Sequence, residues 1–244
     1  MLSIRYQKSW DLVDRYYLSR GWLHGYRKFE ALVSDAVGSS SLLLDIGCGR
    51  DFPLAGFYQP LAREIHGVDR ETDPARIPSG VTVREGRAEA IPYPDDYFDV
   101  VVSRCVLEHL EHPVSAFREF RRVLKPGGRV IFLTANKYDY NSVLARMIPN
   151  ALHGRIVEFC EGRQNGDTFP TYYRVNTKRE ILRQAATGGF GVEWLEYWNN
   201  YPSSFMFSPA LFRAAVGYDR LVRRFRWLHW LQGWLIGVLQ VVKT

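Results

Sequence analysis

Residues 41–50 combine an apolar run, one acid and two closely spaced glycines, and this combination limits the folds open to the chain. Residues 42–44 are all leucine, which predicts a strand buried on both faces, as in parallel sheets. Asp45 would then stand at the carboxyl end of that strand, where open α/β sheets hold their ligands. Gly47 and Gly49 tolerate φ > 0 and lack a Cβ, so a ligand can approach the backbone closely. Taken alone, the stretch would also fit an ordinary strand-to-helix turn.

Short runs of apolar and β-branched residues recur along the chain and predict further strands after the first. They lie at residues 64–69, 81–86, 98–103, 129–134, 192–198 and 234–243. Periodic or capped segments predict helices at residues 9–37 (two short ones), 53–63, 113–124, 177–187 and 209–226. This alternation indicates an α/β fold with a mostly parallel sheet and helices on both faces.

The length of 244 residues fits one domain with a sizeable core. Regular alternation fails between residues 137 and 176, where aromatic and polar residues form a long insertion. Long loops over a rigid sheet usually carry specificity, so we interpret this insertion as a substrate lid. The single domain, 1–244, is therefore expected to hold N-terminal helices at 1–40, a ligand-binding core at 41–136, lid segments at 137–176 and 200–230, and a closing strand at 234–243.

The cysteines and the first residues bear on the compartment. Cys48, Cys105 and Cys160 are odd in number and lack CxxC spacing, which favours a reducing compartment over a disulfide framework or a zinc site. The first eight residues have no apolar core of signal-peptide length. We therefore expect a cytoplasmic protein.

The positive charge is concentrated near the carboxyl end. Residues 211–226 hold five arginines and one aspartate, so this segment carries +4 of the net charge of +6. Such a cluster suits a phosphorylated substrate, a lipid surface or nucleic acid, and equally a solvated helix face. The predicted helix 209–226 would dock on the domain or lie on a membrane surface with its arginines at the head groups. The apolar stretch after it is too short and too interrupted to span a membrane.

Five motifs occur in a fixed order along the core, separated by strand-length spacings. They are Leu-Asp-Ile-Gly-Cys-Gly at 44–49, Gly-Val-Asp-Arg at 67–70, the run from Glu85 to Val101, Leu-Glu-His-Leu at 107–110, and Leu-Lys-Pro-Gly-Gly at 124–128. As an ordered set they resemble the class I S-adenosylmethionine-dependent methyltransferases, of the small single-domain type found in quinone biosynthesis. The resemblance implies a Rossmann-like, mostly parallel seven-stranded sheet with an antiparallel final strand.

The resemblance also implies S-adenosyl-L-methionine as the cofactor and assigns residues to its parts. The glycine turn receives the methionine part, and Asp45 bonds the amino end through the loop or water. Asp69 accepts both ribose hydroxyls, because an ionised carboxylate offers two oxygens and no competing donor. The cofactor-binding residues expected on this basis are Asp45, Gly47, Cys48, Gly49, Asp69, Arg70, Ala88, Glu89, Ser103 and Arg104.

Two positions depart from the family pattern. Asp51 stands where the family often has a third glycine beside the turn. Arg87 stands where the family often has an acid that binds the adenine amino group. Because arginine has no acceptor, that contact would have to come from elsewhere, and the Glu89 carboxylate is the candidate.

Methyl transfer is an in-line displacement that needs alignment and a deprotonated nucleophile. His109, just after the fourth strand, is the predicted general base. Alternatively, His109 and Glu108 shape the start of the next helix and touch the cofactor without titrating. His109 and His112 have HxxH spacing, but no third ligand accompanies them, so we expect no metal site.

Aromatic and hydrogen-bonding residues in the insertion could hold a sugar, an aromatic ring or a phosphate, although such aromatics also form lid cores. The predicted substrate-binding residues are Tyr140, His153, Tyr172, Tyr173 and Arg174. A GxGxxG fingerprint is missing, which argues against a nicotinamide-dependent oxidoreductase. The expected activity is therefore methyl transfer to a small-molecule or lipid- or glycan-linked acceptor. The alternatives left open are a non-catalytic methyltransferase-like module and an RNA methyltransferase, although no RNA-binding module accompanies the basic helix.

Overall fold

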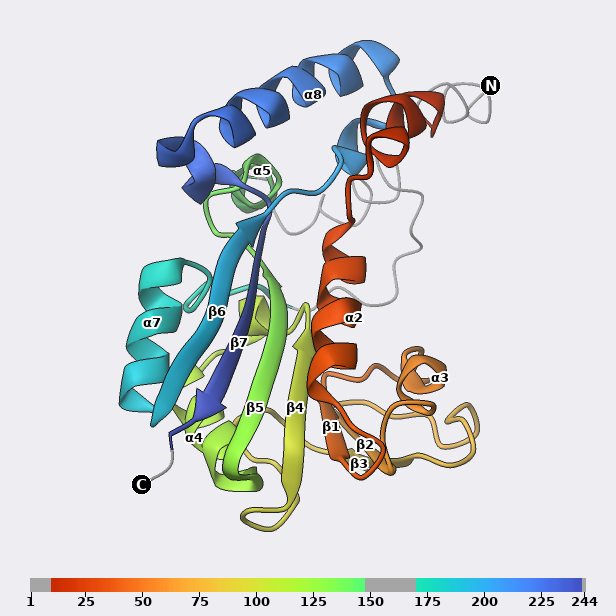
Figure 1. The fold of residues 1–244 in the computed structure, drawn as a ribbon, viewed down its shortest axis with the longest axis vertical. Helices are drawn as coiled ribbons and strands as arrows, with labels where there is room; N and C mark the ends of the chain where they lie inside the picture. The colour runs from red at the N-terminus through yellow and green to blue at the C-terminus, as the bar shows by residue number, and fades with distance from the viewer. Residues whose placement is uncertain (1–9, 148–169, 243–244) are drawn as a thin grey trace. The chain divides into compact units, whose positions relative to one another are not determined.

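The computed structural model describes residues 10–147 and 170–242 (Figure 1). The described residues fall into two compact units. The sheet unit consists of residues 29–134, 171–196 and 235–242. The helical unit consists of residues 10–28, 135–147 and 197–234. Each unit is described by itself below.

The sheet unit is built on a seven-stranded sheet with the order β3-β2-β1-β4-β5-β7-β6. Its strands are β1 (Leu42–Ile46), β2 (Glu64–Asp69), β3 (Thr82–Glu85), β4 (Phe98–Arg104), β5 (Leu124–Ala135), β6 (Phe190–Trp198) and β7 (Trp234–Val241). The first five strands pair in parallel. Figure 1 shows β7 running opposite to its neighbours. The predicted Rossmann-like α/β fold is therefore confirmed.

Strand β1 lies between β2 and β4 and pairs in parallel with both. Leu43 is opposite Ile65 on one side and Val100 on the other. The strand order therefore reverses beside β1, and such a switch point opens a crevice at the carboxyl ends of the strands. All five residues of β1 are buried, as the leucine run predicts.

Helices cover the sheet on both faces. The helices α4 (Pro113–Val123) and α7 (Lys178–Thr187) contribute Phe117, Phe120 and Ile181 to the apolar core that also holds Leu44 of β1. Figure 1 draws α2 (Gly25–Ala36) in front of the sheet and α4 behind it. The connections from β2 to β3 and from β3 to β4 contain no helix.

A carboxylate joins three strands at their amino ends. Asp99, the second residue of β4, accepts the backbone N–H of Leu42 at 2.8 Å. The Lys125 Nζ donates to both Asp99 oxygens at 2.9 Å. Leu42 is the first residue of β1, and Lys125 is the second residue of β5. The Asp99 side chain therefore ties β1, β4 and β5 together.

The helical unit has its own small core. Its elements are the helical residues 10–16, η1 (Leu18–Arg20), α5 (Tyr140–Met147), η3 (Ser203–Phe205), α8 (Pro209–Arg224) and η4 (Arg226–Leu231). Leu12 and Val13 pack with Phe212 and Val216 of α8. The Tyr17 hydroxyl donates to the buried Asp219 carboxylate of the same helix at 3.1 Å.

Most predicted elements occur with boundaries that differ by a few residues, and the clearest differences concern α3, α8 and β5. The helix predicted at 53–63 is reduced to α3 (Ala55–Tyr58), and the helix predicted at 209–226 ends at Arg224. The Lys-Pro-Gly-Gly turn does not precede β5. It lies inside the strand as a bulge, because the register with β4 shifts between Phe98 and Val100.

The capping box predicted at the start of α7 is present. The Thr177 hydroxyl accepts the Glu180 N–H at 3.2 Å and donates to the Glu180 carboxylate at 2.9 Å. The closing strand predicted at 234–243 is β7, and its last predicted residue lies outside the described residues. The single-domain organisation and the lid segments stay predictions.

Candidate cofactor site

The loop after β1 adopts a conformation that requires glycine. Gly47 has φ +75° and Gly49 has φ +82°, in the left-handed region that L side chains rarely adopt. A Cβ on Gly47 would lie 2.2 Å from Cγ2 of Val106. The Gly47 N–H donates to the Val68 carbonyl at 2.7 Å, which holds the turn against the end of β2. The glycines thus form a backbone cradle at the switch point.

Asp69 joins this turn to the end of β2. Its Oδ2 accepts the Gly49 N–H at 2.8 Å, and its Oδ1 accepts the Glu71 N–H at 3.2 Å. A carboxylate has about four acceptor positions, so Asp69 can accept further donors from a ligand. The side chain is only partly buried, which leaves it accessible.

Asp45 lies at the end of β1 and is buried. The Tyr58 hydroxyl of α3 donates to its Oδ2 at 3.1 Å. Burial raises the pKa of Asp45 to about 7, against the opposing effects of the Tyr58 hydrogen bond and the Arg104 charge. A cationic ligand group beside Asp45 would therefore stabilise its ionised form.

The end of β4 contributes two more predicted residues, and the turn after β1 contributes one more. Ser103 is fully buried, and its hydroxyl has no hydrogen-bond partner among the described residues. Arg104 follows it and is close enough to Asp45 to affect its ionisation. Cys48 is buried, and burial raises the pKa of its thiol. Its contact with a cofactor stays a prediction.

The predicted adenine end lies in the loop after β3. Ala88 is buried, whereas Arg70 is exposed. Arg87 is held between two carboxylates, with its Nε 3.7 Å from Glu89 and its Nη2 4.0 Å from Glu111. Glu89 also accepts the His112 N–H at 3.4 Å. Glu89 therefore stands where it can compensate for Arg87, and its contact with a ligand stays a prediction.

The second departure, Asp51, has a local partner. Its carboxylate lies 3.8 Å from Nη2 of Arg76. The neighbouring Arg50 forms an ion pair with Glu71, and its carbonyl accepts the Asp73 N–H at 3.0 Å. These contacts connect the loop after β1 to the loop after β2.

His109 ends a short turn, η2 (Leu107–His109), and is partly buried. The preceding Glu108 is buried and accepts the Thr134 hydroxyl at 2.6 Å. Asn176 in turn donates to the Thr134 hydroxyl oxygen at 2.7 Å. The Glu108 carbonyl accepts the Tyr172 N–H at 2.8 Å. This buried network fixes the turn that carries His109 to the segment after residue 170.

Sequence reasoning missed three polar residues of this site: Tyr58, Thr134 and Asn176. Thr134 carried the clearest signal, because it is a polar residue at the end of the apolar run of β5. Tyr58 and Asn176 contact partners far away in the sequence, and no spacing rule pointed to them.

The predicted substrate residues are spread over the chain. Tyr172 is exposed, with the Arg174 guanidinium 5.2 Å from its ring centre, and Tyr173 is buried with φ +50°. Arg174 also donates to the Glu111 carbonyl. Tyr140 belongs to the helical unit, where its ring stacks on Phe205.

His153 lies outside the described residues. The structure therefore brings Tyr172, Tyr173 and Arg174 into the sheet unit with the cofactor residues, and contact of any of the five with a substrate stays a prediction.

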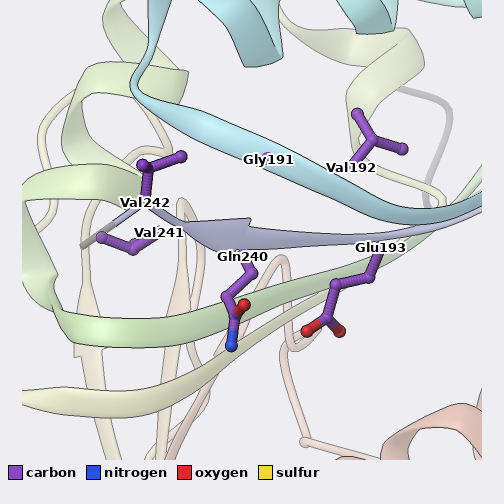
Figure 2. Close-up of a pocket in the computed structure, with 6 residues that line it drawn as sticks. All are labelled: Gly191, Val192, Glu193, Gln240, Val241 and Val242. Atoms are coloured by element: carbon purple, nitrogen blue, oxygen red, sulfur yellow. The ribbon is translucent and has the colours of Figure 1, made fainter.

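A surface hollow of about 500 Å³ lies elsewhere, where β6 begins and β7 ends (Figure 2). It is lined by Gly191, Val192, Glu193, Gln240, Val241 and Val242. Its carboxylate, Glu193, is paired with Arg129 at 2.8 Å. Because β6 begins at the end of the sheet opposite the glycine turn, this hollow is not the site of the chemistry.

Comparison with known proteins identifies the part of the chain that holds this site. Residues 44–132 match the family model described as a methyltransferase domain. The predicted resemblance to this family is thereby confirmed.

Two curated relatives show the same likeness over part of their length. This chain is similar to the uncharacterized methyltransferase YcgJ of Bacillus subtilis, with 34% identity over 39% of this chain and 40% of YcgJ. It is also similar to the ubiquinone biosynthesis O-methyltransferase of Cereibacter sphaeroides, with 33% identity over 46% of this chain and 51% of that protein. The chain spans about half or less of the length of these relatives.

The fold is shared more widely than the sequence. The crystal structure of the [4+2]-cyclase SpnF matches 89% of this chain and 81% of its own, with a TM-score of 0.56 and 21% identity. At this identity the likeness concerns the fold alone.

Replacing Gly47 tests the cradle. We expect Gly47→Ala to lower the free energy of unfolding by roughly 1–3 kcal/mol, because it forces φ > 0 and overpacks Val106. Gly56→Ala is the control, since nothing lies within 4 Å of its added Cβ and it sits in α3. Urea unfolding measures both. Equal stability of the two variants would contradict the assigned geometry.

The dependence of the free energy of unfolding on pH tests the raised pKa of Asp45. Its pKa is higher in the folded protein than in the unfolded chain, so stability falls as pH rises from 4 to about 7 and is level above that. Asp45→Asn removes this dependence. We therefore expect wild type to lose about 3 kcal/mol relative to the variant between roughly pH 5 and 9.

The matched control for that titration is Asp35→Asn on the exposed side of α2. Parallel pH profiles of wild type and Asp45→Asn would show that Asp45 is already ionised when folded at pH 5.

Proposed function

We propose that the protein is an S-adenosyl-L-methionine-dependent methyltransferase that acts on a small-molecule or lipid- or glycan-linked acceptor. The observation that carries the proposal is the Asp69 carboxylate, which lies beside the glycine cradle and bonds the Gly49 N–H. The family of residues 44–132 supports the same reading.

The residues present fit this cofactor. Asp69 keeps acceptor positions for the two hydroxyls of a ribose. The missing Cβ atoms of Gly47 and Gly49 leave the backbone open to the methionine part, and buried Asp45 suits its ammonium group. When bound, the cofactor supplies an electrophilic methyl group on a sulfonium.

His109 is proposed as the group that takes the proton lost by the acceptor. Its turn is held by the Glu108, Thr134 and Asn176 network, so the imidazole is carried on a fixed backbone. Fixed placement matters because in-line displacement gains mainly from alignment.

The acceptor is proposed to meet the segment that follows residue 170. Tyr172 offers an exposed aromatic face, and the adjacent Arg174 offers a cation beside it. These groups suit a ring, a sugar or a phosphate. Tyr140 and His153 are proposed as further parts of a lid.

A non-catalytic module is the second candidate, and the substitutions at positions 51 and 87 favour it. Both side chains have partners on the protein, Arg76 for Asp51 and Glu89 for Arg87. Titration with S-adenosylhomocysteine, followed by turnover with candidate acceptors, separates the two. An isothermal titration without binding at millimolar cofactor would overturn the proposal.

Asp69→Asn tests the ribose contact. We expect at least about tenfold weaker binding of S-adenosylhomocysteine, because the variant loses the charge and gains a donor. Glu71→Gln, two residues away, makes the same change of charge and should bind within about twofold of wild type. Equal affinities in all three proteins would remove Asp69 from the cofactor site.

His109→Ala tests the base. With any acceptor that supports release of S-adenosylhomocysteine, we expect kcat to fall by about 100-fold. Cofactor affinity should stay within about threefold, since the imidazole would act on the acceptor. His112→Ala, the exposed partner of the HxxH spacing, is the control. Equal and modest losses in kcat and affinity would exclude His109 as base.

A further inference from the structure

The end of α8 and the turn η4 present cations beside exposed apolar side chains. Trp227 is 73% exposed, Leu221 is 51% and Phe225 is 42%. Large apolar side chains this exposed and this close together are uncommon on a soluble surface and indicate an interaction site. We call this the arginine–tryptophan surface. It consists of Arg213, Arg220, Leu221, Arg224, Phe225, Arg226, Trp227 and Trp230.

The helix keeps these residues apart from its buried face. Phe212, Val216, Asp219 and Val222 of α8 are buried. Arginines 213, 220 and 224 are separated by seven and four residues, which places them in one line on the exposed side. Between residues 209 and 234, five arginines face one acid, Asp219. That acid is buried and bonded to Tyr17.

The turn that carries the tryptophans is fixed to its own unit. The Tyr218 hydroxyl donates to the Leu231 carbonyl at 3.5 Å, and the Asn136 amide donates to the Trp230 carbonyl at 2.7 Å. The His229 ring nitrogen lies 3.3 Å from the Arg223 carbonyl. The exposed rings therefore belong to a pre-formed surface, and binding need not order it first.

We propose that the arginine–tryptophan surface binds the interface of an anionic lipid bilayer. Arginines pair with phosphate groups, and tryptophan rings prefer the boundary between head groups and acyl chains. Leu221 and Phe225 supply the apolar part that enters this boundary. Within residues 10–147 and 170–242, none of the helices meets the length and hydropathy that a bilayer span requires.

Two other occupants fit less well. The phosphates of a nucleic acid would pair with the arginines, and its bases would stack on the aromatic rings. It has no apolar group of its own that would bury the aliphatic Leu221 side chain. A second copy of the chain would bring a second arginine line against the first in a two-fold interface, and like charges repel. An anionic bilayer satisfies the cations and the apolar side chains together.

The test is co-sedimentation of the full chain with vesicles of phosphatidylcholine, with or without phosphatidylglycerol. We expect binding to the anionic vesicles and at least about tenfold weaker binding to the neutral ones. Raising NaCl from about 0.1 M to about 0.5 M should weaken anionic binding by about tenfold or more. Absence of binding to anionic vesicles would overturn the proposal.

Two sets of variants test the residues. Trp227→Ala with Trp230→Ala should reduce vesicle binding by about tenfold or more, whereas Trp10→Ala, an exposed tryptophan elsewhere, should not. The triple change of arginines 213, 220 and 224 to glutamine should weaken binding by about 100-fold. The control triple, arginines 118, 179 and 183 to glutamine, removes the same charge from exposed positions on α4 and α7. If both triple variants lost the same amount of vesicle binding, the binding would depend only on net charge, and the assignment to this surface would be overturned.

Two further outcomes would overturn it in favour of another occupant. One is binding of single-stranded RNA that competes fully with vesicles and survives the tryptophan changes. The other is a dimer in sedimentation equilibrium that Trp227→Ala converts to a monomer. Cofactor titration of each variant shows that it is folded, and it is independent of vesicle binding.

Discussion

The candidate site depends on one hydrogen bond, from the Gly49 amide to the Asp69 carboxylate. It joins the turn after β1 to the end of β2, two segments twenty residues apart that meet because the strands are parallel neighbours. The bond sets the distance between the glycine cradle and the carboxylate, and it uses only part of the acceptor capacity of Asp69. This hydrogen bond therefore holds the glycine cradle and the Asp69 carboxylate in a fixed relation to each other.

Two buried carboxylates in the sheet unit, Asp45 and Glu108, are stabilised in different ways. Asp45 has the hydroxyl of Tyr58 as its hydrogen-bond donor and a raised pKa, so its charge responds to pH and to a bound cation. Glu108 is tied to Thr134, which is tied to Asn176, and this chain also holds the segment after residue 170. The first arrangement suits ligand binding and the second suits positioning, because a connected polar network rigidifies what it joins.

Strand positions and the order of the site motifs could be read from the sequence, because apolar runs and glycines act locally. The residues that complete the site could not be predicted from the sequence. Tyr58 reaches Asp45 from thirteen positions away, and Asn176 reaches Thr134 from forty-two, distances over which only the folded topology decides contacts. The Lys-Pro-Gly-Gly turn was misplaced for a similar reason. Its glycines suggest a break between elements, whereas pairing with β4 absorbs them as a bulge within β5.

The contacts of Asp99 with Leu42 and Lys125 have a consequence for redesign of this protein. They fasten β1, β4 and β5 at their amino ends, at the far end of the strands from the cradle. Strand register is thereby fixed independently of the loops at the carboxyl ends. The loops at the carboxyl ends could therefore be exchanged while the pairing of these three strands is kept.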